Sequence, residues 1–146
     1  MKVAVGADHG GLEVKRRVVA HCERAGYQVL DLGTDTPDSV DYPVYAKNVA
    51  QAVARGEADR GVLICTNGVG MCMAANKVPG IRAALVRIPE NAARSRAHND
   101  ANILCLAGGV DAALELEKVL ETWFATEFEG GRHARRVGLM MELDDL

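Results

Sequence analysis

Short apolar runs alternate along this chain with segments of helical periodicity. The runs contain mostly Val, Ile, Leu and Ala with few polar interruptions, which is typical of strands buried on both faces. The expected strands are Lys2–Ala7, Tyr27–Leu32, Gly61–Cys65, Ile81–Val86 and Ile103–Leu106. The segments between them repeat apolar residues at helical spacing, and the expected helices are Leu12–Ala25, Tyr42–Arg55, Gly70–Asn76, Glu90–Ala97, Asp111–Thr126 and a last helix at about 132–144.

Alternation of strands and helices predicts an α/β fold with a five-stranded parallel sheet covered on both faces. The chain has 146 residues, which is enough for one domain with a sizeable core, and it shows no linker or internal repeat. We therefore expect a single domain over residues 1–146. In open parallel sheets, ligands bind beyond the carboxyl ends of the strands. The residues that follow each strand are the first candidates for a functional site.

Composition narrows the classes of partner. The net charge is −3 and aromatic residues make up 4% of the chain, which argues against nucleic-acid binding. No segment approaches the length of a membrane span, and the first apolar run is too short for a signal peptide. The four cysteines form no C-x-x-C pair and favour reduced thiols in a cytoplasmic protein; they are Cys22, Cys65, Cys72 and Cys105. Because the net charge is negative, an anionic ligand would need a local group of positively charged side chains.

The segment CTNGVG, Cys65–Gly70, follows an expected strand and precedes an expected helix. Glycines there let backbone N–H groups converge near a helix N-terminus, which suits a phosphate or an enediolate oxygen. The same field favours the thiolate form of Cys65. The alternative is that Cys65 is only a small buried residue. The C-x5-R signature of cysteine phosphatases is absent because residue 71 is Met, and no P-loop or dinucleotide-binding fingerprint is present.

Three further motifs carry candidate chemistry. Asp8 and His9 directly follow the first strand, although Asp8 is also a suitable helix cap. The HND motif that begins at His98 offers an acid–base group and an amide, or alternatively a loop that ends a helix. Arg132 and Arg136 lie four residues apart, on one helix face, where they could bracket a phosphate or form a solvated surface.

The spacing of cysteines and histidines predicts no metal site. The four residues considered as ligands show no short ligand spacing; they are His9, Cys65, Cys72 and His98. A serine hydrolase is also excluded, because no G-x-S-x-G motif occurs.

Taken together, these motifs resemble the family of ribose-5-phosphate isomerase B and the galactose-6-phosphate isomerase subunits. The resemblance covers nearly the whole chain, in the ordered blocks GADHGG, SVDYP, CTNGVGMCMAANKVPGIRAAL, ARSRAHNDANIL and EGGRHARRV. It implies a Rossmann-like three-layer sandwich and a homodimer with two active sites across the interface, with a tetramer as the other assembly. The last helix is then expected to contact the partner subunit. No cofactor or metal is implied.

The resemblance also implies roles for individual residues in an aldose–ketose isomerase that forms a cis-enediolate from ribose 5-phosphate. Cys65 is the expected base and His98 the acid that opens the sugar ring. The loop that would hold the enediolate comprises Thr66, Asn67, Gly68, Val69 and Gly70. Sugar hydroxyls would contact Asp8, Tyr42 and Asn99, and the phosphate would contact His9, Arg132 and Arg136. A branch of the family that uses a glutamate base has it at the position of Met71, so this chain matches the cysteine branch.

The chain departs from the family pattern in two places. The loop usually reads C-G-T-G-x-G, whereas here Thr66 and Asn67 replace the first glycine and the threonine. An arginine that commonly contacts the neighbouring subunit's phosphate aligns with Gly109, or with Val110 after a one-residue shift; the candidate substitutes are Arg87, Arg94 and Arg135. Because of these departures, the alternative that the substrate is another sugar phosphate, with four, five or six carbons, stays open. A binding module without catalysis is the alternative of another class, and Cys65 and His98 argue against it.

Overall fold

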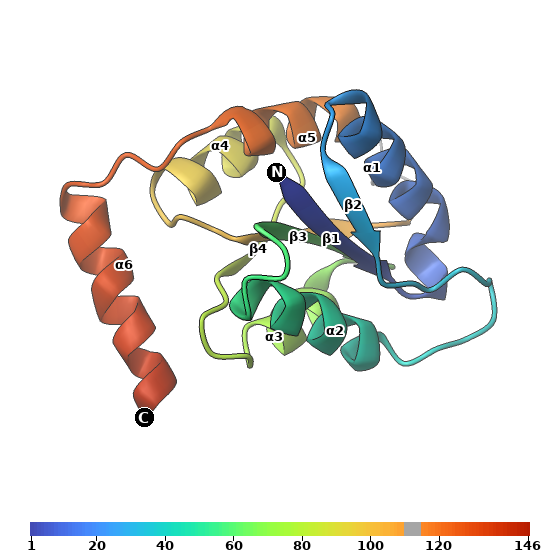
Figure 1. The fold of residues 1–146 in the computed structure, drawn as a ribbon, viewed down its shortest axis with the longest axis horizontal. Helices are drawn as coiled ribbons and strands as arrows, with labels where there is room; N and C mark the ends of the chain where they lie inside the picture. Colours follow the sequence, from blue (N-terminus) through green and yellow to red (C-terminus); the bar gives the residue numbers. More distant parts are fainter. Residues whose placement is uncertain (110–114) are drawn as a thin grey trace.

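Five parallel strands in the described part of the chain form one sheet, in the order β2-β1-β3-β5-β4 (Figure 1). The computed structural model describes residues 1–109 and 115–146. The strands are β1 (Lys2–Ala7), β2 (Gln28–Asp31), β3 (Arg60–Cys65), β4 (Ala83–Leu85) and β5 (Ile103–Ala107). The helices are α1 (Leu12–Arg24), α2 (Tyr42–Ala54), α3 (Val69–Ala75), α4 (Pro89–Ala97), α5 (Leu116–Ala125) and α6 (Arg132–Glu142), with 3-10 helices η1 (His9–Gly11) and η2 (Leu143–Asp145).

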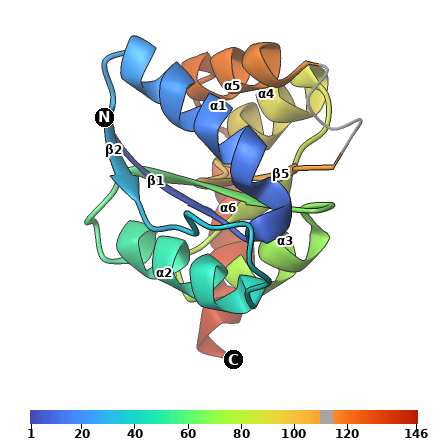
Figure 2. The same cartoon turned by 90° about the vertical axis from the view of Figure 1, so that its right-hand side faces the viewer.

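Helices cover both faces of this sheet, which confirms the expected α/β sandwich. One face packs against α1, α4 and α5, and the other against α2 and α3 (Figures 1 and 2). Alternate residues of the same strand enter the two cores, since Val3 and Val5 join the first core and Ala4 the second. This explains why the central strands read as continuous apolar runs.

The carboxyl ends of the three central strands lie side by side. Ala7 of β1 pairs with Ile64 of β3, and Cys65 of β3 pairs with Ala107 of β5. The residues that follow these strands therefore emerge at one edge of the sheet. Figure 2, which is turned toward this edge, places α6 behind the sheet.

Most expected boundaries are close to the observed ones, and β4 is the exception. It covers three residues, whereas the sequence predicts a strand over Ile81–Val86. The shortening has a local cause, because the Ile81 amide donates to Val78 in a turn and the Arg82 amide donates to the Asn102 side chain. The expected start of the fifth helix at Asp111 falls outside the described residues.

Helix α6 extends away from the rest of the domain (Figure 1). None of its residues, all of which the structure describes, is buried. Leu139 and Leu143 are 51% and 61% exposed, so an apolar strip on and after this helix faces outward. Among the described residues, no helix combines the length and the apolar character that crossing a membrane requires.

Candidate functional site

Cys65 lies at the end of β3, under a tight glycine turn. Its thiol is almost inaccessible, and the Gly68 amide donates a hydrogen bond to the sulfur at 3.2 Å. Gly68 has a φ of 80°, in the left-handed region, and a Cβ there would lie 2.6 Å from a Leu85 methyl carbon and 3.0 Å from the Leu106 carbonyl carbon. Only glycine fits this position. The turn therefore fixes a backbone N–H group against the sulfur of Cys65.

Asp8 and His9 lie beside this turn, at the end of β1. Asp8 is buried, and its Oδ1 accepts from the Gly10 amide at 2.9 Å, so Asp8 caps the 3-10 helix η1 rather than α1. His9 is exposed, and its Nδ1 accepts from the Val40 amide at 3.1 Å. The imidazole proton is therefore on Nε2 when His9 is neutral. Thr66 completes the group, because its hydroxyl oxygen lies beside Gly10, where a Cβ of residue 10 would otherwise be.

Tyr42 and Gly109 border the same turn. A Cβ at Gly70 would lie 2.7 Å from the Tyr42 ring, so the ring packs directly on the glycine loop. The Gly109 amide donates to the Thr66 carbonyl at 3.1 Å. Asn67 accepts the Val69 amide at 3.0 Å through its Oδ1, which leaves its NH2 as the donor. We call this group the cysteine half-site; it comprises Asp8, His9, Tyr42, residues 65–70 and Gly109.

His98 and Asn99 belong to a second group. They line a cavity of about 300 Å³ together with four residues of α6: His133, Arg136, Val137 and Met140. The His98 and His133 rings are stacked, with centroids 4.3 Å apart. Removal from water and the neighbouring charges, His98 first and then Arg132, hold the pKa of His133 below its ordinary value. We call these residues, with Arg132, the histidine half-site.

The two half-sites lie at opposite edges of the sheet. Gly109 is two residues beyond the end of β5, whereas His98 and Asn99 precede its start. A five-residue strand spans about 16 Å, so one chain does not bring Cys65 and His98 together. The structure therefore assembles the predicted residues into two groups, and neither group alone contains both a thiol and the expected acid.

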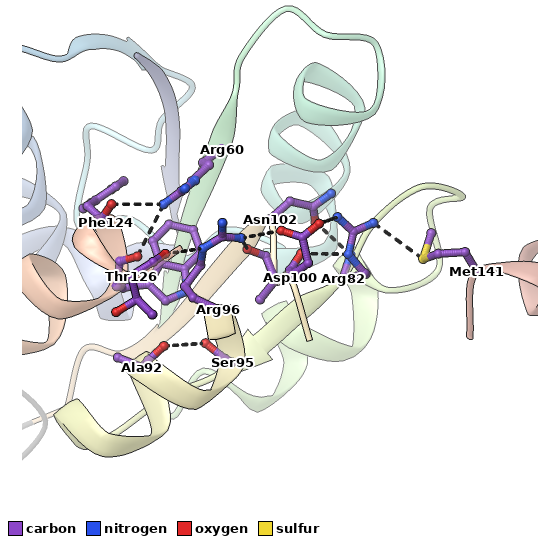
Figure 3. A network of polar contacts seen from close by, with 12 residues as sticks. Arg60, Arg82, Ala92, Ser95, Arg96, Asp100, Asn102, Phe124, Thr126 and Met141 are labelled. Carbon is purple, nitrogen blue, oxygen red and sulfur yellow. Dashed lines mark hydrogen bonds and ion pairs between the residues drawn. The ribbon is translucent and has the colours of Figure 1, made fainter. Parts of the chain in front are cut away.

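A polar network holds the loop that carries His98 and Asn99 (Figure 3). Asp100 has a φ of 49°, and its carboxylate accepts from Arg96 at 3.0 Å and from Arg82 at 3.3 Å. Arg96 is buried and also donates to the Ala101 carbonyl at 2.6 Å. The third residue of the HND motif is thus an anchor, and the first two are presented to the cavity.

Sequence reasoning missed Glu129 and gave His133 no role. Glu129 has its carboxylate 3.4 Å from His98 Nε2 and 3.7 Å from His133 Nε2. Its amide donates to the Ala97 carbonyl at 3.0 Å, which fixes it beside the end of α4. The spacing of Glu129 and His133, four residues apart, was an available indication of side chains on neighbouring turns.

Comparisons with known proteins agree with this architecture. The model of a family described as Ribose/Galactose Isomerase matches residues 3–140. Ribose-5-phosphate isomerase B of Escherichia coli is 47% identical over 137 residues, 93% of this chain and 91% of that protein. The structure of Clostridium thermocellum ribose-5-phosphate isomerase B is 48% identical, with a TM-score of 0.94 over 99% of this chain and 98% of the other. A Mycoplasma genitalium ribose-5-phosphate isomerase B, solved with bound ribulose 5-phosphate, is 39% identical, with a TM-score of 0.92 over 99% and 96%.

Proposed function

The chain belongs to the Ribose/Galactose Isomerase family, and from this premise we propose that it interconverts ribose 5-phosphate and ribulose 5-phosphate. Relatives named for this reaction cover nearly the whole chain, and one of them was solved with the ketose product. The observation that carries the proposal is the amide hydrogen bond to Cys65, beside polar groups suited to a phosphorylated sugar.

Cys65 acts as the base in the proposed mechanism. Its thiolate removes the proton from C2 of the open-chain aldose, the C2–H electron pair forms the C1=C2 double bond, and the π pair of the C1 carbonyl moves to O1. The same proton then returns from sulfur to C1, where the C1=C2 pair forms the new C–H bond, and the O2–H proton passes to O1 as the C2 carbonyl forms. The Gly68 and Val69 amides already donate to Cys65 Sγ and to Asn67 Oδ1, so other backbone amides of the 66–70 loop hold the enediolate oxygen. Gly70 in the first turn of α3 offers such an amide, because its N–H has no acceptor within the helix. The sulfur and these amides belong to one turn, so the negative charge moves only a short distance, from the sulfur to the enediolate oxygen.

The histidine half-site supplies the ring-opening acid. His98 donates a proton to the ring oxygen, and Asn99 beside it addresses a hydroxyl group, as Asp8 and Tyr42 do from the cysteine half-site. The phosphate is bound by His9 Nε2 and by two forked guanidinium groups, those of Arg132 and Arg136.

A complete site then requires two chains, since the two half-sites are on opposite edges of one sheet. We propose a homodimer in which the histidine half-site of one subunit faces the cysteine half-site of its partner. The exposed apolar strip of α6 supports this arrangement, because packing against a partner would cover it.

The four cysteines are free thiols, which supports a reducing, cytoplasmic location.

Subunit complementation tests the shared site. Neither Cys65→Ala nor His98→Ala should turn over ribose 5-phosphate by itself. After the two variants are mixed, dissociated and reassembled, half of the dimers are mixed and each has one intact site of two. Activity should therefore return to about a quarter of that of the unmodified protein. No recovery in verified mixed dimers would contradict a site shared between chains.

A substrate panel tests the sugar. Thr66 and Asn67 change the loop, and Gly109 lacks a positive charge. The alternative substrates to test are therefore phosphorylated tetroses, other phosphorylated pentoses and hexose 6-phosphates. Ribose 5-phosphate should give the highest kcat/KM in a ketose assay without added metal. A higher value for another sugar would change the assignment of the substrate. Tight binding of sugar phosphates without turnover of any of them would support a binding module.

A further inference from the structure

Three possible metal ligands meet outside the cysteine half-site, although the sequence spacing indicated none. His98 Nε2 is 3.4 Å and His133 Nε2 is 3.7 Å from the same oxygen, Oε2 of Glu129. One ligand atom of each of the three residues lies within 4.8 Å of the others. His98 ends α4, Glu129 lies in the connection before α6, and His133 is in the first turn of α6. We call these residues the His-Glu-His cluster.

The distances in this cluster suit a metal better than direct hydrogen bonds. Both nitrogen–oxygen separations exceed the usual 2.7–3.2 Å of an N–H···O bond. Two ligands of a tetrahedral ion with bonds of about 2.0–2.1 Å lie roughly 3.3 Å apart. The two nitrogen–oxygen separations, 3.4 and 3.7 Å, are near this value, and all three ligand atoms lie within 4.8 Å of one another, so a small closing movement would bring them around one ion. Two imidazoles and one carboxylate form a donor set that zinc accepts in sites with one open position.

We propose that His98, Glu129 and His133 bind a divalent transition-metal ion, for which Zn²⁺ is the representative probe. The fourth position would face the cavity beside Asn99 and Arg136, which has a volume of about 300 Å³ and can hold a water ligand. The amide hydrogen bond from Glu129 to Ala97 keeps the carboxylate next to His98 before any ion arrives.

Two features oppose binding and limit its strength. The imidazole planes are nearly parallel, 8° apart, so the rings must rotate to direct both nitrogen lone pairs at one ion. The side chains of His98 and Glu129 are 40% and 56% exposed, which gives them the freedom to adjust. Arg132 and Arg136 also place positive charge nearby. We therefore expect weaker binding than in a structural site with four protein ligands.

Occupation of this cluster would inhibit the enzyme. An ion on the Nε2 atom of His98 replaces the proton that this residue would donate in ring opening. This consequence rests on the proposed function, whereas metal binding itself does not. The cluster would thus make the isomerase sensitive to free transition-metal ions.

Calorimetric titration of the metal-free, full-length protein with Zn²⁺ tests the site. Binding should be weakened at least tenfold by Glu129→Gln and by His133→Ala. The matched controls are His21→Ala, which removes a histidine of α1, and Cys72→Ala, which removes the partly exposed thiol; both should leave the affinity unchanged. An unchanged affinity in Glu129→Gln and His133→Ala would overturn the proposal.

Co²⁺ substitution identifies the ligand atoms independently of activity. A nitrogen and oxygen site gives visible d–d bands without the near-ultraviolet sulfur charge-transfer band. A strong sulfur band that disappears in Cys65→Ala or Cys72→Ala would place the ion on a thiol and overturn the proposed cluster.

An activity titration separates this inference from the proposed function. Zn²⁺ should inhibit turnover of ribose 5-phosphate at the concentrations that fill the site, and a chelator should reverse the inhibition. Stoichiometric binding without inhibition would overturn the inhibitory role. An inactive metal-free protein would overturn the proposed function, and the calorimetric comparison would still decide whether the cluster binds metal.

Discussion

The cysteine half-site and the histidine half-site are built in different ways. The first is formed by backbone at the ends of three adjacent strands, where Gly68 and Gly108 leave no space for a side chain. The second is formed by side chains from a helix end, a connection and α6, a helix without a buried residue in the described structure. The backbone of the first is therefore positioned by the sheet itself, whereas the second depends on ion pairs and, in the proposed dimer, on contacts with the partner subunit.

This difference predicts what each half-site tolerates. Added volume should damage the cysteine half-site, because its glycines contact backbone of neighbouring strands. Loss of charge should damage the histidine half-site, because charged groups hold its loop and face its cavity.

Cys65→Ala tests whether the cysteine half-site contains the base. We expect kcat to fall about 10³-fold, the scale of a lost general base, with little change in KM. Cys72→Ala is the matched control, since it removes a thiol from the helix that follows and should keep kcat within about twofold. Thermal unfolding of both variants reports the fold. Full activity in Cys65→Ala would exclude the proposed base.

Asp100→Ala tests the anchor of the histidine half-site. The substitution leaves buried Arg96 without its carboxylate partner, so we expect a loss of about 2–3 kcal/mol in the free energy of unfolding. Asp100→Asn should cost less, because asparagine also tolerates a positive φ. Glu90→Ala is the control; it breaks an exposed ion pair with Arg94 on α4 and should cost at most about 0.5 kcal/mol. Equal losses in Asp100→Ala and Glu90→Ala, measured by urea unfolding, would contradict the anchoring role.

Arg136→Ala tests phosphate binding from α6. Loss of a charge-assisted hydrogen bond of about 1.5–3 kcal/mol should raise KM for ribose 5-phosphate roughly 10- to 100-fold, with a smaller change in kcat. Arg135→Ala is the matched control, since its side chain is exposed on the same helix and Arg136 lines the cavity. A similar rise in KM for Arg135→Ala would instead assign part of the phosphate contact to Arg135.

The contrast between the half-sites also explains which parts of the fold and of the site could be predicted from the sequence. The apolar runs predicted all five strands, and the strand ends predicted the grouping of Asp8, His9 and Cys65, because parallel strands align their carboxyl ends. His98 was grouped with them by resemblance, although its loop precedes β5 and lies at the other edge within one chain. Glu129 could not be placed, because its contact with His98 depends on how the connection after α5 returns to the end of α4.

Cys72 supplies a smaller test, based on pH. A hydrogen bond from Cys105 lowers the pKa of the Cys72 thiol to about 7, whereas burial raises the pKa of Cys22 to about 11. A lowered pKa means more thiolate above pH 7, so alkylation of Cys72 by iodoacetamide should accelerate about tenfold between pH 6 and pH 8 and then level off. Peptide mass spectrometry separates the four cysteines. A rate that still rises tenfold from pH 8 to pH 9 would contradict the lowered pKa.

Gly109→Arg should improve the cysteine half-site, in contrast to every other addition of volume there. A Cβ at Gly109 would lie 3.2 Å from the Thr66 carbonyl oxygen, so a shift of a few tenths of an ångström accommodates it. The new guanidinium would stand where the family resemblance implies a phosphate contact, and we expect KM for ribose 5-phosphate to fall about three- to tenfold. Gly108→Ala is the opposite control, because its Cβ would collide with the Gly10 carbonyl oxygen and should destabilise the fold. An unchanged or higher KM in a folded Gly109→Arg protein would show that residue 109 does not face the phosphate, and the missing charge would then have no bearing on which sugar this isomerase prefers.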